Sequence, residues 1–89
     1  MNAVATPVSF DRDVRPLFRQ IDIDHMSPYG VLLADYGYMS APENNHANAQ
    51  DVLDFLSGKK QPQMPIGGPF WDSTKLSLYQ RWRDDGYKP

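Results

Sequence analysis

The stretch WDSTKLSLYQRWRDDG, residues 71–86, predicts an amphipathic helix and thereby decides the fold class. Asp72 precedes the first turn, where a carboxylate accepts hydrogen bonds from free backbone N–H groups. Gly86 stands where a helix commonly ends. The apolar side chains between them recur at three-residue intervals and lie near one face: Leu76, Tyr79 and Trp82. We therefore expect a helix that buries an aromatic stripe.

A second helix is expected immediately before Gly58, because four apolar residues follow the spacing of one helix face. These residues are Ala49, Val52, Leu53 and Leu56. Gly58 is suited to the left-handed conformation that closes many helices. Asn44 or Asn45 is expected as the N-cap, since asparagine is a favoured residue at that position.

The N-terminal part predicts a third helix, over residues 13–21, with Pro16 in its first turn. Its apolar face is formed by Val14, Leu17, Phe18 and Ile21. Asp35 is expected to cap one extra turn that runs through Met39. Since no strand pattern and no internal repeat is found, we expect one all-α domain over residues 1–89, a small bundle of three main helices with long loops.

Composition limits the classes of function. The chain has 89 residues, a formal net charge of −2 and no cysteine. Without cysteine, disulfides, thiolate zinc sites, iron–sulfur clusters and thioether attachment of a cofactor are excluded. Charges of both signs are interspersed, so nucleic acid is not an expected partner. No run approaches the roughly 20 apolar residues of a membrane span and no secretory signal is found, so we expect no membrane association and a cytoplasmic location.

Two parts of the chain resemble small cytochrome c domains. VSFDRDVRPLF at residues 8–18 resembles the segment that enters their first helix. MPIGGPFW at 64–71 and LSLYQRWRDDGY at 76–87 resemble their ending, where a Met-Pro-rich loop precedes a helix with a W-x-x-x-G pattern. The resemblance covers most of the chain apart from residues 27–50, and it implies a cytochrome c-like fold.

The motif that attaches haem in that family, C-x-x-C-H, is missing. Aligned on Pro16, its two cysteines fall on Asp22 and His25, and its histidine falls on Met26. The resemblance therefore implies a cytochrome c-like domain that has lost covalent haem, so electron transfer is not carried over and no cofactor is expected. Residues 21–26 are then interpreted as a polar helix end followed by a turn.

A haem-free domain of this kind has to fill the space of the porphyrin, because protein interiors are densely packed. The candidates to fill it are Tyr29, Tyr36, Tyr38, Met39, Met64, Ile66, Phe70 and Trp71. Some of these residues could instead form a docking surface, since tyrosine, tryptophan and methionine are enriched at interfaces. The candidate contact residues are Tyr36, Tyr38, Met64, Phe70 and Trp71. The expected function is a non-catalytic interaction or accessory module that binds a larger protein or self-associates.

The alternative function is binding of a small ligand, a metal or non-covalent haem in the former haem crevice. His25, Met26 and Met64 are its candidate ligands, because imidazole and thioether groups serve as axial ligands of haem iron. A second metal hypothesis joins Asp22 and Asp24 to His25, with His46 as a distant fourth ligand. A third hypothesis is catalysis with His25 as a general base. Since the sequence contains no nucleophile motif, we favour a chain without catalytic activity of its own.

Overall fold

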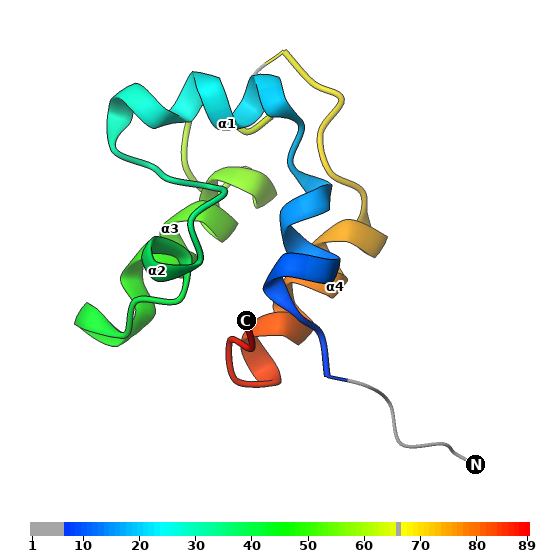
Figure 1. Cartoon of the computed structure of the whole chain (residues 1–89). Helices are drawn as coiled ribbons and strands as arrows, with labels where there is room; N and C mark the ends of the chain where they lie inside the picture. Colours follow the sequence, from blue (N-terminus) through cyan, green and yellow to red (C-terminus); the bar gives the residue numbers. More distant parts are fainter. Residues whose placement is uncertain (1–6, 66) are drawn as a thin grey trace.

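The computed structural model describes residues 7–65 and 67–89, and helices dominate it (Figure 1). Its α-helices are α1 (Gln20–Met26), α2 (Tyr36–Met39), α3 (Glu43–Ser57) and α4 (Ser73–Asp84). A π-helical turn (Phe10–Val14) and two 3-10 turns (Arg15–Leu17 and Ser27–Tyr29) complete the regular structure. The described residues contain no β-strand, only an isolated parallel bridge between Ser9 and Lys88. The all-α prediction is confirmed, and none of the described helices has the length and apolarity to cross a membrane.

Helix α4 forms as predicted. The Asp72 carboxylate accepts a hydrogen bond of 3.0 Å from the Lys75 backbone N–H, and Gly86 follows the helix with a positive φ of 99°. Tyr79 and Trp82 are fully buried, whereas Leu76 is half-buried at the edge of the core. The aromatic stripe is therefore the core-facing side of this helix.

Helix α3 also buries its predicted face and ends at Gly58, whose φ of 87° is left-handed. The prediction of an asparagine N-cap is wrong. The helix follows Pro42, and Asn44, Asn45 and His46 form a turn with positive φ angles of 53°, 60° and 59°. Asparagine tolerates this conformation better than most residues, because its short polar side chain can bond to the backbone nearby.

The helix predicted over residues 13–21 is wrong, because the chain is extended at Phe18 with ψ 128°. The helical segment begins at Phe10 instead, after Ser9, whose hydroxyl accepts from the Arg12 N–H. Pro16 therefore lies beyond the first turn, where its missing N–H interrupts the hydrogen-bond ladder. Helix α1 then begins anew at Gln20, so residues 21–26 are a helix and not the polar helix end and turn that was expected.

A chain of aromatic contacts forms the centre of the core. Trp82 lies 5.4 Å from Phe10 and 5.6 Å from Tyr79 between ring centroids. Trp71 lies 6.3 Å from Tyr79 and 5.2 Å from Phe18. These tilted and edge-on geometries are the favoured ones for aromatic pairs. The column of rings joins the N-terminal turns to α4 and to the loop that precedes α4.

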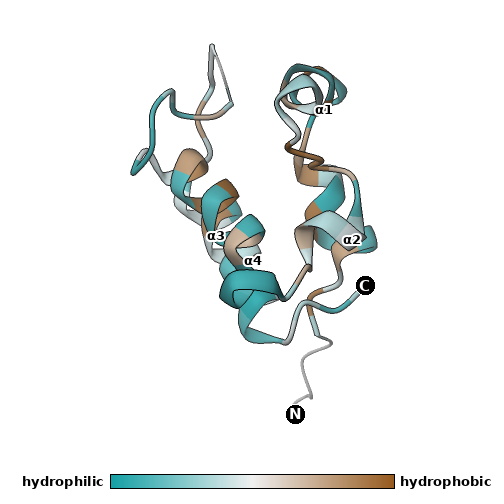
Figure 2. Ribbon diagram, turned by 90° about the vertical axis from the view of Figure 1, so that its left-hand side faces the viewer, coloured by the Kyte–Doolittle hydropathy of each residue, from teal (hydrophilic) through white to brown (hydrophobic). Residues whose placement is uncertain are grey.

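Polar contacts hold the other elements to α4. The Tyr79 hydroxyl donates to the Ala49 carbonyl of α3 at 2.8 Å, and burial raises the pKa of this hydroxyl so that it stays a donor. The Trp82 indole N–H donates to the Lys88 carbonyl, and the Phe10 N–H donates to the same carbonyl. Figure 2 shows α3 and α4 side by side, each with apolar and hydrophilic residues interspersed, as expected for helices buried on one face.

The buried hydrogen bond between α4 and α3 gives a test of this packing. Tyr79→Phe leaves the ring in place and removes the hydroxyl by which α4 donates to the Ala49 carbonyl. We therefore expect a loss of about 1–2 kcal/mol in the free energy of unfolding. Urea denaturation measures it. The control Tyr38→Phe alters a half-buried tyrosine and is expected to change stability by less than about 0.5 kcal/mol. Equal losses in both variants would contradict this account.

Candidate functional site

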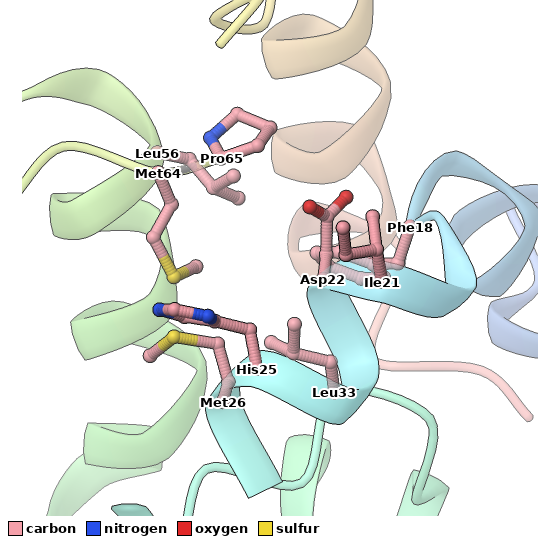
Figure 3. Close-up of a pocket in the computed structure, with 9 residues that line it drawn as sticks. All are labelled: Phe18, Ile21, Asp22, His25, Met26, Leu33, Leu56, Met64 and Pro65. Atoms are coloured by element: carbon pink, nitrogen blue, oxygen red, sulfur yellow. The ribbon is translucent and has the colours of Figure 1, made fainter. Parts of the chain in front are cut away.

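A cavity of about 100 Å³ lies between α1, α3 and the loop of residues 58–71 (Figure 3). Its lining is mainly apolar: Phe18, Ile21, Asp22, His25, Met26, Leu33, Leu56, Met64 and Pro65. Figure 1 shows how this place arises, because residues 58–65 leave α3 and pass beside α1, whereas residues 67–72 lead into α4. The cavity therefore depends on segments that lie far apart in the sequence.

An adjoining groove of about 350 Å³ continues the cavity along the C-terminal end of α1. The residues that line it are His25, Met26, Tyr29, Val31, Phe55, Gln61, Pro62 and Met64. His25, Met26 and Met64 line both spaces and so separate the inner cavity from the groove. These are the three residues that the sequence proposes as ligands, and the fold brings them together.

Each of the three side chains is positioned by a different local feature. Met26 is the last residue of α1 and is buried, with 8% of its surface exposed. His25 precedes it and is exposed. Met64 belongs to the loop, where its backbone N–H donates to the Phe55 carbonyl of α3 at 2.9 Å, and only 3% of its surface is exposed. In Figure 3 the imidazole of His25 is seen between the sulfur atoms of Met26 and Met64.

Asp22 stabilises the helix that carries two of these residues. Its carboxylate accepts from the Arg19 backbone N–H at 3.1 Å and from the Arg19 guanidinium at 2.8 and 3.0 Å. Burial raises the pKa of Asp22, whereas the hydrogen bonds and charge of Arg19 and the charge of His25 lower it. The lowering effects together exceed the effect of burial, so the pKa of Asp22 lies below its ordinary value. Asp22 is therefore an ionised, fully paired helix cap at the start of α1.

The metal site of Asp22, Asp24, His25 and His46 is not assembled. Asp24 accepts from the side chain of Gln20 at 2.9 Å, and His46 stacks on Tyr87 with ring centroids 3.9 Å apart, on another part of the chain. No three His, Asp or Glu side chains of the described residues are close enough to share an ion. This hypothesis is wrong for the arrangement observed.

The five candidate contact residues do not form one exposed surface. Met64 and Trp71 are buried, Phe70 is 54% exposed, and Tyr36 and Tyr38 are half-buried. Tyr36 packs on Phe10, donates to the Tyr87 carbonyl and lines neither the cavity nor the groove. Among the side chains expected to fill the porphyrin space, Met39 is fully buried and Tyr29 is 74% exposed, while Ile66 lies outside the described residues.

The residues of this chain offer no covalent attachment for haem, because the sequence contains no cysteine. The inner cavity, at about 100 Å³, is smaller than the roughly 300–1,000 Å³ of pockets that enclose small organic ligands, whereas the adjoining groove of about 350 Å³ falls within that range. Leu33 and Leu56 are fully buried and form part of the cavity lining.

Known proteins do not extend this description. No protein-family model matches the chain, and no curated protein or solved structure is similar to it.

Arg19, Leu33 and Leu56 contribute to the site without having been predicted there. Leu33 lies in a segment without periodicity, so no pattern in the sequence singles it out. Arg19 could have been found from its spacing, since an acidic residue three positions after an N-cap forms a recognised capping arrangement.

The Arg19–Asp22 pair predicts how acid acts on the site. Asp22 has a folded-state pKa below its unfolded value, so its contribution to stability is complete above the unfolded pKa and is lost as the pH falls through the folded pKa. Arg19→Gln removes the charged partner and is expected to raise the pKa of Asp22. Carboxyl carbon shifts in an NMR pH titration measure it.

Arg12→Gln is the matched control for that titration, because Arg12 pairs in the same way with Asp13 and lowers its pKa to about 2. This variant is expected to shift the Asp13 titration and to leave Asp22 unchanged. An unchanged Asp22 pKa in Arg19→Gln would show that the pair does not control the charge of the cavity wall.

Proposed function

We propose that the chain is a non-catalytic accessory module with a haem-free cytochrome c-like architecture, which binds a protein partner or a second copy of itself. The observation that carries this proposal is the apolar rim of the cavity and groove. Ile21 is 66% exposed at the inner cavity and Tyr29 is 74% exposed at the groove. Exposed apolar side chains that continue an apolar groove form the kind of patch that marks a protein interaction site or a ligand-binding groove.

Two contacts support the cytochrome c-like architecture. The N-terminal turns pack on α4 through Phe10 and Trp82, and the segment of Met64 and Pro65 faces the end of α1 across the cavity. These are the two parts of the chain that carry the resemblance. The position aligned with the family's histidine, Met26, faces the same cavity.

The chemistry of the cavity supports a non-catalytic role. Its carboxylate, Asp22, is held by Arg19 and is therefore not free to accept a proton from a substrate. Neither lining contains a serine, threonine, cysteine or lysine among the described residues. His25 makes no hydrogen bond to a side chain of the described residues that it could activate, whereas a catalytic base is positioned within hydrogen-bond distance of the group that it deprotonates.

The partner that fits this surface presents an apolar segment. Burying Ile21 and Tyr29 removes a large aliphatic and a large aromatic side chain from water, and full burial of a single aliphatic side chain such as Ile21 is worth about 1.5–3 kcal/mol. A stable interface of standard size buries about 800 Å² on each partner. The rim would then form its centre, where apolar anchors contribute most to affinity.

Ile21→Glu tests this proposal, because it places a charge at the centre of the surface without touching the core. We expect association with the partner or with a second copy to weaken by at least about tenfold, since a loss of 1.4 kcal/mol corresponds to that factor. Analytical ultracentrifugation over a wide concentration range measures self-association. Affinity capture from a native lysate, followed by titration of the purified partner, measures the other case.

Leu32→Glu is the matched control, because Leu32 is also exposed, at 38%, but lines neither space. It is expected to bind as the unchanged chain does. A chain that stays monomeric and captures the same proteins with and without Ile21→Glu would contradict the proposal.

A further inference from the structure

We propose that Met26, Met64 and His25 form a binding site for monovalent copper. The site is a separate property from the partner surface, since it needs only the three side chains that divide the cavity from the groove. Two of them come from the last turn of α1 and one from the loop of residues 58–71, so a bound ion would join these two segments.

The donor atoms favour this ion over others. Thioether sulfur is a soft, neutral ligand that selects Cu(I), and imidazole nitrogen also binds copper well. Magnesium and calcium require several oxygen ligands, and the cavity carboxylate is already paired with Arg19. Structural zinc takes four ligands from cysteine, histidine and carboxylates, and the described residues contain no such group of even three.

The surroundings of the three donors suit a soft monovalent ion. Phe18, Leu33 and Leu56 form the apolar wall behind them, and a hydrophobic shell limits access of water to a metal centre. Met26 and Met64 are almost entirely buried, whereas His25 is exposed at the groove. Copper would therefore enter from the groove and bind to donors whose sulfur atoms already point into the shared space (Figure 3).

Two adjacent donors on one helix end reduce the ordering that binding requires. Helix α1 is held at its start by the Arg19–Asp22 cap and ends with His25 and Met26. Met64 is held to α3 through its backbone N–H. Preorganised ligands lose less conformational freedom on binding, so the site needs no disordered segment to fold around the ion.

Packing alone offers a competing explanation. Methionine fills irregular gaps in a core and makes favourable contacts with flat rings, so Met26 and Met64 could lie against His25 only for that reason. The two explanations differ in what happens when copper is supplied. If the three side chains only pack together, a competing chelator keeps the Cu(I). If they form a binding site, the protein takes Cu(I) from the chelator in a fixed ratio of copper to protein.

The experiment supplies Cu(I) as its acetonitrile complex, without oxygen, to the full chain in the presence of a coloured Cu(I) chelator. We expect one equivalent of copper to transfer to the protein. Methionine methyl signals in an NMR titration with Ag(I), a redox-stable substitute, are expected to shift for Met26 and Met64 and not for Met39. Zn(II) added in the same way is expected to produce no such shift.

Three variants assign the ligands. Met26→Leu and Met64→Leu conserve volume, which usually costs less than about 1.5 kcal/mol of stability, and His25→Ala alters an exposed residue. Each is expected to weaken Cu(I) binding by at least about tenfold, because even removal of an outer partner of a metal ligand has an effect of 10–100-fold. Met39→Leu is the control, since Met39 is equally buried but lines neither space.

Circular dichroism and thermal melting confirm that each variant is folded. Failure of the unchanged chain to take copper from the chelator would overturn the proposal. Binding that survives all three substitutions, or that shifts Met39 as much as Met26, would also overturn it. Because partner binding is tested by Ile21→Glu, which leaves all three donors in place, failure of either proposal is distinguishable from failure of the other.

Discussion

The fold depends on one column of aromatic rings that runs through the core from Phe10 to Phe18. Trp82 and Tyr79 on α4 form its centre, and Trp71 extends it to the loop that precedes this helix. In a chain of 89 residues the core is small, and each buried aromatic removes about 150–250 Å² from water. The column therefore supplies much of the hydrophobic stabilisation and also sets where the N-terminal turns, α3 and the loop must lie.

The last ring of this column, Phe18, forms part of the wall of the candidate site. Phe18 contacts Trp71 and also lines the inner cavity, and its extended backbone separates the N-terminal turns from α1. Arg19 and Asp22 then start α1 in a new direction. At the position where the resemblance places the first haem-binding cysteine, the chain thus has a carboxylate that holds the helix itself.

The extent to which sequence predicts this structure differs between its two halves. For α3 and α4, helix period and glycine ends agree with one another, and the C-terminal ends and the buried face of α3 are confirmed. The N-cap of α3 is wrong, and Leu76 on the predicted face of α4 is only half-buried. In the N-terminal half the same period is misleading. Helical spacing is shared by Val14, Leu17, Phe18 and Ile21, but the helical turns end at Leu17 and the backbone is extended at Phe18. Ile21 is consequently exposed and not part of the core. The break results from Pro16 and from the Arg19–Asp22 cap, which act locally and leave the apolar pattern unchanged. The candidate ligands were identifiable by residue type, but only the path of the loop brings Met64 to α1.

The space next to these residues opens to solvent. The exposed side chains of Ile21 and His25 line it, so its volume does not carry the energetic cost of an enclosed cavity in the core. Met26 and Met64 are the most adaptable apolar side chains available to close it, yet both stop at its border with their sulfur atoms directed toward His25. Because Leu33 and Leu56 are fully buried behind this opening, the same arrangement keeps the core closed and leaves the three potential ligands accessible from the groove.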